Sequence, residues 1–128
     1  MRSLTAALVA VAFTSSGVAQ EAPLTSKYFD EAKITVSSGP NADGFMRVRV
    51  IPENGTPRET TLAILNRMSE NELARGITDA LNTVLGPEYV ADKDGGEHVK
   101  IRKEARDAAN FSVEITFNAP GFSVILED

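Results

Sequence analysis

Residues 111–127 read FSVEITFNAPGFSVILE, and this stretch shows most clearly what kind of structure the chain forms. From Phe111 to Phe117 every second residue is apolar and the residues between them are polar, which is the pattern of a half-buried strand. Asn118–Gly121 has the composition of a turn. Residues 122–127 are again rich in residues that favour strands. The stretch therefore predicts two strands that are joined by a short turn and pair as a hairpin.

Other segments show the same alternation. In residues 45–51 (FMRVRVI) Met46, Val48 and Val50 fall on one face of a strand, and the arginines between them fall on the other. A loop rich in Gly, Pro, Asn and Asp precedes this segment at Ser38–Gly44. The other expected strands are 33–37 (KITVS), a short one at 89–91 and 98–103 (HVKIRK).

The segment between 53 and 68 has two interpretations. Thr56, Pro57 and Glu59 could begin a helix, as N-cap, first helical residue and capping-box partner. Alternatively, Asn54-Gly55 forms a hairpin turn and a strand follows at 59–65 (ETTLAIL). The adjacent threonines and the preceding strand favour the hairpin.

Residues 69–85 predict a helix. Ser69 and Glu72 have the spacing of a capping box, apolar residues recur at helical intervals after Glu72, and Gly86-Pro87 is typical of a helix end. Residues 104–110 (EARDAAN) are polar and rich in alanine, which indicates a short helix.

Together these elements predict an α+β fold. A mixed, mostly antiparallel sheet carries one long helix, about residues 70–85, packed on one face, and a short helix lies near 104–110. We expect a single domain over residues 33–128, preceded by an N-terminal arm at 20–32 whose Tyr28 and Phe29 contact the domain.

The first 19 residues have the pattern of a Sec-type signal peptide. Arg2 is followed by an apolar core, Leu4–Phe13, and small residues end at Ala19, where we place the cleavage. An uncleaved membrane anchor is the alternative, but a span needs about 20 apolar residues, and this core is shorter. We therefore expect a secreted, periplasmic protein with no membrane span after cleavage.

Composition narrows the possible functions. The formal net charge of −5 argues against nucleic acid as a partner. There is no cysteine, which excludes thiol chemistry and thiolate metal sites, and one histidine, His98, which lies at an outward strand position beside basic residues. The run Asp92–Glu97 begins like a calcium loop but lacks the later ligands, so it is typical of a hairpin turn. We predict no catalytic residues, no metal and no cofactor.

One feature of the charge distribution is local. Cations concentrate on the strand 98–103 and just after it, in an otherwise acidic chain, and two more lie on the strand 45–51. These residues form either a solvated sheet face or a basic strand face that binds an anionic partner. The candidate binding residues are Arg47, Arg49, His98, Lys100, Arg102 and Arg106.

Residues 60–117 resemble part of the bacterial flagellar P-ring protein, a periplasmic ring component. The segments that carry the resemblance are Ile51–Gly55, Leu62–Asn66, Ala74–Asn82, Leu85–Pro87, Asp92, Val99–Ile101, Glu104–Phe111 and Val113–Ile115. The family has a proline where this chain has Lys103. The resemblance implies a self-assembling or scaffold-binding role near peptidoglycan.

The sequence thus favours a non-enzymatic structural or interaction module of a cell-envelope complex in the periplasm, with a relation to the flagellar basal body implied by the resemblance. Its partner would be another protein or a second copy of itself, with peptidoglycan as a further possibility. The alternative is a small periplasmic ligand-binding or inhibitor domain that uses its loops at 38–44 and 92–97.

Overall fold

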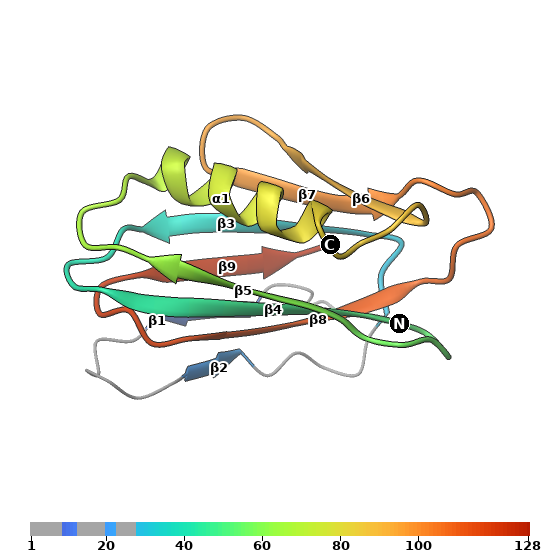
Figure 1. Ribbon diagram of the computed structural model, residues 1–128, viewed down its shortest axis with the longest axis horizontal. Helices are drawn as coiled ribbons and strands as arrows, with labels where there is room; N and C mark the ends of the chain where they lie inside the picture. The colour runs from blue at the N-terminus through green and yellow to red at the C-terminus, as the bar shows by residue number, and fades with distance from the viewer. Residues whose placement is uncertain (1–8, 13–19, 23–27) are drawn as a thin grey trace.

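A computed structural model describes residues 9–12, 20–22 and 28–128, the first two ranges as backbone only. These residues form nine strands and one helix, and Figure 1 shows their arrangement. Their bounds are β1 Val9–Ala12, β2 Gln20–Ala22, β3 Glu31–Ser38, β4 Gly44–Pro52, β5 Arg58–Ile64, α1 Glu70–Asn82, β6 Tyr89–Lys93, β7 His98–Lys103, β8 Phe111–Phe117 and β9 Ser123–Glu127.

The strands form two sheets and not one. Sheet A has the strand order β1-β9-β3-β7-β6, and sheet B has the order β2-β8-β4-β5. Every pair of neighbouring strands is antiparallel. The predicted α+β fold with a single mixed sheet is therefore wrong, and the protein has a mainly β fold with one helix. Strands β3 to β9 were predicted from their own residues, whereas β1 and β2 lie in the predicted signal peptide and arm and were not predicted. The sheet that a strand joins depends on its neighbours, which the local pattern does not specify.

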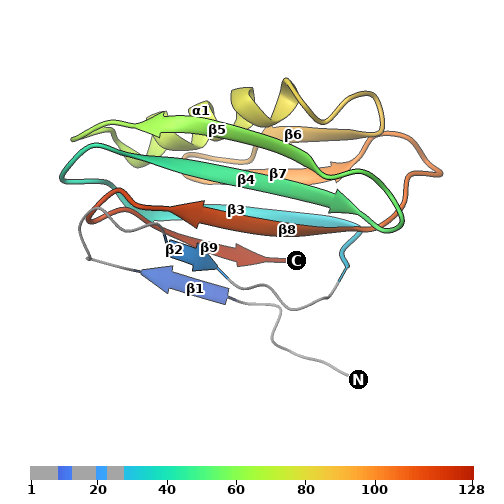
Figure 2. The ribbon, with the colours of Figure 1, turned by 60° about the horizontal axis from the view of Figure 1, so that its bottom comes forward.

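The core lies between the two sheets, as the stacked layers in Figure 2 show. Alternate residues of each central strand are buried. Sheet A contributes Ala32, Ile34 and Val36 of β3. Sheet B contributes Met46, Val48 and Val50 of β4 and all four apolar residues of β8. Aromatic rings fill the space between them, with Phe117 and Phe122 packed edge to face at a centroid distance of 5.1 Å.

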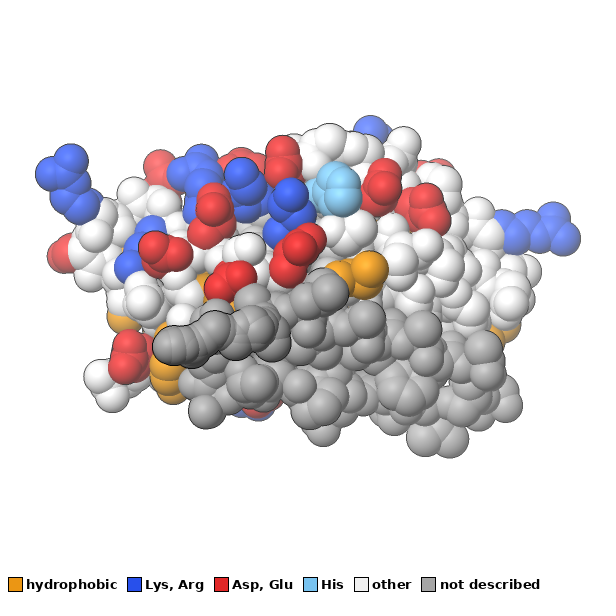
Figure 3. Space-filling view, turned by 180° about the vertical axis from the view of Figure 1, so that it is seen from behind, with side chains coloured by type: hydrophobic (Ala, Val, Ile, Leu, Met, Phe, Trp, Pro, Cys, Tyr) orange, Lys and Arg blue, Asp and Glu red, His pale blue; other side chains and the backbone are white. Residues whose placement is uncertain are grey.

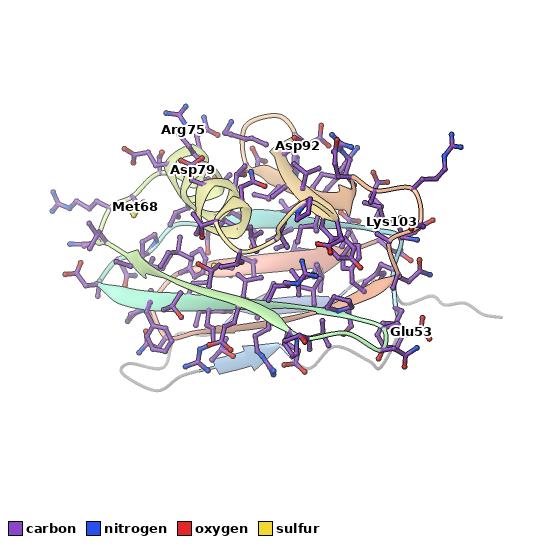
Figure 4. All side chains as sticks on the ribbon, turned by 45° about the vertical axis from the view of Figure 1, so that its right-hand side comes forward. Glu53, Met68, Arg75, Asp79, Asp92 and Lys103 are labelled. Carbon is purple, nitrogen blue, oxygen red and sulfur yellow. The ribbon has the colours of Figure 1, made fainter. Side chains whose placement is uncertain are left out.

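Helix α1 follows from its sequence, but its position differs from the expected one. Ser69 caps the helix and exchanges hydrogen bonds with Glu72, as predicted. Its buried residues are Leu73, Ala74, Ile77 and Leu81, while Arg75 and Asp79 point away from the sheets (Figure 4). The helix contacts β5 of sheet B and β3, β6 and β7 of sheet A. It therefore covers one side of the sandwich, where the two sheets end, and not the face of a single sheet.

The hairpin interpretation of residues 53–65 is confirmed. Strands β4 and β5 pair directly, with Val50 opposite Arg58. The turn between them includes Asn54, whose backbone is left-handed at φ 63°, a conformation that asparagine tolerates better than most residues. The Gly55 N–H donates to the Pro52 carbonyl at 2.9 Å and closes the turn.

The predicted hairpin of the last two strands is wrong. Strand β8 pairs with β4 and β2 in sheet B, whereas β9 pairs with β3 and β1 in sheet A. Residues 118–122 cross from one sheet to the other. The Asn118 side chain accepts a hydrogen bond from the Phe45 N–H at 2.8 Å, and Gly121 turns the chain at φ 84°. This arch places Phe117 and Phe122 inside the core, which a flat hairpin would not do.

The short helix predicted near 104–110 is also absent, since these residues form bends and a turn. The N–H groups of Glu104 and Ala105 both donate to the Glu88 carbonyl, at 2.7 and 3.1 Å. The Asn110 carbonyl accepts from the Glu53 N–H at 2.8 Å. Inside the segment the Ala108 N–H donates to the Ala105 carbonyl at 3.0 Å, which closes a single turn that does not continue as a helix.

The N-terminal predictions are only partly covered by the structure. Most of the predicted signal peptide, including the cleavage position near Ala19, lies outside the described residues, and its Val9–Ala12 forms β1. In the expected arm, Gln20–Ala22 forms β2. Phe29 is buried and bridges Phe111, with N···O distances of 2.6 and 2.9 Å, whereas Tyr28 is exposed.

Candidate functional site

The outward face of sheet A carries the clearest gathering of charge in the described residues. Strand β7 lies between β3 and β6, and its alternation turns Val99 and Ile101 into the core. His98, Lys100 and Arg102 consequently point outward from one strand, as the sequence predicts. We refer to these three residues and the carboxylates around them as the β7 face.

Each cation of the β7 face is matched by acidic groups. The Arg102 Nε lies 2.7 Å from the Asp92 carboxylate, and the Lys100 Nζ lies 3.7 Å from Glu31 and 3.9 Å from Asp94. Arg102 also approaches Glu104 at 3.4 Å, and Lys33 approaches Asp94 at 3.7 Å. Figure 3 shows the resulting surface, in which basic and acidic side chains lie side by side. The face is therefore mixed in charge and not purely basic.

These ion pairs are open to solvent. The Lys100 side chain is 34% exposed and that of Arg102 is 43% exposed, so water and salt screen them and they add little to stability. The hydrogen bond to Asp92 raises the pKa of Arg102, which keeps this guanidinium charged. Exposed pairs of this kind are available to exchange their partners for charges on another molecule.

His98 has a structural neighbour on the same face. Its ring Nδ1 lies 2.8 Å from the Thr35 hydroxyl oxygen, and the two residues are directly opposite each other on β7 and β3. A cross-strand bond of this kind orients the ring along the sheet.

The remaining predicted site residues do not join this surface. Arg47 and Arg49 point outward from β4 in sheet B, on the opposite side of the sandwich. They pair there with Glu59 at 3.6 and 3.3 Å, and Arg49 also pairs with Glu114 at 2.8 Å. The six predicted residues therefore form two separate surfaces.

Arg106 is exposed in the turn after β7. Within residues 28–128 neither Arg106 nor Lys103 makes an ion pair, so both are unmatched cations that closely follow Arg102 in the sequence. Lys103 lies at the end of β7 (Figure 4).

The loop tested for calcium is a hairpin turn. The Asp94 N–H donates to the His98 carbonyl at 2.8 Å, Gly95 has a φ of 81°, and the Lys93 Nζ donates to the Gly95 carbonyl at 2.9 Å. In the part of the chain that the structure describes, no group of three or more acidic, His or Cys side chains is arranged to hold a metal ion.

A second polar cluster lies beneath the end of the helix. The Arg58 guanidinium donates to the Leu85 carbonyl, lies 3.1 Å from the Glu88 carboxylate and stacks 5.5 Å from the centre of the Tyr89 ring. The Tyr89 hydroxyl donates to the Ala109 carbonyl at 2.6 Å. Burial raises the pKa of Tyr89, although Arg58 partly opposes this. The cluster joins β5, the helix end and β6, which is a structural role.

Sequence analysis missed the carboxylates of the β7 face. A signal for them was present, because the turn at residues 94–97 makes β6 and β7 a hairpin in which Asp92 is opposite Lys100. Asp92 lies on β6, at the top of the view in Figure 4. The contacts of Arg58 join residues 27 and 30 positions apart, and no local pattern indicates them.

Comparison with known proteins does not assign the chain to a family. No protein-family model matches the chain, and no curated protein matches it significantly. Among the described residues, no helix is both long enough and apolar enough to cross a membrane.

Proposed function

We propose that this chain is a non-enzymatic, periplasmic interaction module of a cell-envelope complex, exported by a signal peptide that is cleaved near Ala19. In this proposal the β7 face is the docking surface. The partner is a protein whose own surface carries both signs of charge, and a flagellar ring or rod component is the first candidate, because of the resemblance of residues 60–117.

The observation that carries the proposal is the composition of the β7 face. Lys100 and Arg102 lie on β7, between β3 and the edge strand β6, each within 4 Å of two carboxylates, and all of these groups remain accessible. A surface with alternating charges selects a partner with the complementary alternation, and it repels a uniform polyanion through its own carboxylates. This favours a protein partner over peptidoglycan or nucleic acid.

The division of the cations between two sheets provides a matched control. A variant with Lys100→Ala, Arg102→Ala and Arg106→Ala removes charge from sheet A and the turn beside it. A second variant with Arg47→Ala and Arg49→Ala removes charge from sheet B only. Both act on exposed side chains, so both should fold.

The test is an affinity pull-down of the tagged, exported protein from its native periplasm, with bound proteins identified by mass spectrometry. We expect the wild type and the sheet B variant to recover the same envelope-complex components and the sheet A variant to lose them. Equal recovery by both variants would exclude the β7 face as the docking surface. Recovery of the wild-type protein alone, as a monomer, would contradict the interaction module itself.

A further inference from the structure

The outer strands of the two sheets differ in how their free edges are protected. An exposed edge presents unpaired N–H and C=O groups, and proteins protect such edges with charges, bulges or covering segments. The edge of β6 is covered by the helix, because the Asn82 side chain donates to the Ala91 carbonyl at 2.8 Å and accepts from the Ala91 N–H at 2.9 Å. The edge of β5 begins with Arg58 and Glu59 and contacts the same helix.

Strand β9 is protected by one charge only, Glu127 at its end. It reads Ser-Val-Ile-Leu-Glu, without proline, lysine or arginine. One of its sides pairs with β3, and the other pairs with β1, where Val9 is opposite Leu126 and Ala12 is opposite Ser123. Among the described residues, the segment that covers this edge is therefore 9–12, within the apolar core of the predicted signal peptide.

Cleavage near Ala19 would remove β1 and uncover β9, but β2 would remain and still cover the edge of β8 in sheet B. Strand β2, Gln20–Ala22, lies after the cleavage position and pairs with β8 of sheet B. In the exported chain β9 would become the open edge of sheet A, with the buried Val124 and Leu126 next to the vacated position. Figure 2 shows β1 and β2 together on the side of the sandwich that is opposite α1.

We propose that in the exported protein the edge of β9 binds an extended, apolar segment of a partner protein, which adds to sheet A as an antiparallel strand in the position of β1. The inference rests on the proposed export and cleavage, and it names the kind of partner segment that the module accepts. Main-chain hydrogen bonds would supply the affinity, and alternate side chains the specificity.

The register of β1 defines the sequence of such a segment. Residues directly opposite each other on paired strands point to the same face, so the positions opposite Val124 and Leu126 face the core and require apolar side chains. In β1 both positions are valine and the alternate positions are alanine. A segment of alternating β-branched and small residues therefore fits this edge.

A single segment fits better than a second copy of the chain. Strand β1 also contacts β2, so its occupant both pairs with β9 and closes the open side of the sandwich. If β9 of a second copy paired with this edge, it would bring its own β3 with it. The sheet of the second copy would then continue sheet A outward, and the side of the sandwich beside β2 would stay open.

The experiment uses the full chain, expressed with export and recovered from the periplasm, with its N-terminus determined by mass spectrometry. The probe is a synthetic peptide of residues 6–15, AALVAVAFTS, carrying lysines at its end for solubility. Binding is followed by NMR of the isotope-labelled protein. We expect saturable binding, with the largest shifts at the amides of β9, and at least tenfold weaker binding of a peptide with Val11→Pro, which lacks one N–H donor.

A matched pair of protein variants locates the site. Ile125→Lys places a charge on β9 and should weaken peptide binding at least tenfold, whereas Ala63→Lys places the same charge on β5 and should change it less than twofold. If Ile125→Lys does not fold, the comparison of the two peptides decides the question alone.

Three results would overturn the inference. The first is a cleaved protein that does not bind the peptide, and the second is equal binding of the peptide with Val11→Pro. The third is a stable dimer of the exported chain that Ile125→Lys dissociates, because this would assign the edge of β9 to a second copy. A periplasmic product that retains residues 9–12 would refute the cleavage on which the inference rests. Because the binding assay uses purified protein, its outcome is independent of the pull-down from the periplasm.

Discussion

Asn82 links the helix to the edge of sheet A, and its removal should destabilise the protein measurably. Ala91 turns its N–H and C=O away from β7, and the Asn82 amide bonds to both, as a neighbouring strand would. An intramolecular hydrogen bond contributes about 0.5–1.5 kcal/mol net, so the pair contributes about 1–3 kcal/mol. Alanine favours the helix over asparagine by about 0.5 kcal/mol, which offsets part of the loss. We expect Asn82→Ala to lower the free energy of unfolding by about 1–2 kcal/mol.

The control for this variant lies on the same helix. Asn71 is exposed in the first turn, so Asn71→Ala changes the same side chain without removing the edge contact. Urea unfolding of both variants gives the difference in free energy, and thermal melting should place the Asn82 variant several degrees below the Asn71 variant. Amide hydrogen exchange adds a local measurement, because the Ala91 N–H should exchange at least tenfold faster only in Asn82→Ala. A difference between the variants below about 0.5 kcal/mol, with Ala91 still protected, would refute the reasoning.

Three further predictions follow from local geometry. Gly76→Ala should raise the free energy of unfolding by about 0.5–1 kcal/mol in chemical denaturation, because a Cβ there meets Leu62 at an ordinary 3.5 Å. Gly44→Ala should lower it, because its Cβ would lie 2.6 Å from the Ala119 Cα. The opposite order of stability would contradict this packing. Ser69→Ala should cost about 1 kcal/mol by removing the helix cap, and an unchanged unfolding midpoint would show that the cap is redundant. The folded state raises the pKa of Tyr89 above 10, so the contribution of this hydroxyl to stability is complete below pH 10 and is lost as the pH rises through the raised pKa. The free energy of unfolding should therefore fall more steeply in alkali for the wild type than for Tyr89→Phe. Parallel pH curves would contradict this contribution.

Much of the secondary structure could be predicted from the sequence because its causes are local. The alternation in residues 45–51 and 111–117 depends only on the two faces of a strand, and the Ser69–Glu72 capping box depends on residues three apart. The turn at Asn54-Gly55 has the same local origin. These elements were confirmed within one or two residues, apart from the helix, which ends at Asn82 instead of Leu85.

The candidate site was predicted less completely. That His98, Lys100 and Arg102 share an outward face follows from strand periodicity alone. Their separation from Arg47 and Arg49 does not, because it depends on which sheet each strand joins. The acidic partners reach the β7 face through the pairing of β7 with β3 and β6, which converts a basic run in the sequence into a surface of mixed charge.

The sequence by itself determined the positions of strands β3 to β9 and of the helix, the inward and outward faces of those strands, and the turns that join β4 to β5 and β6 to β7, since all of these depend on residues a few positions apart. Only the tertiary structure decided that the strands divide into two sheets, that the chain crosses from β8 in one sheet to β9 in the other at Asn118–Phe122, and that the helix covers one side of the sandwich. The physical reason is that each strand has two edges able to accept many partners with nearly equal hydrogen bonding. The choice among them is made by the packing of the whole core, with Phe117 and Phe122 buried between the sheets.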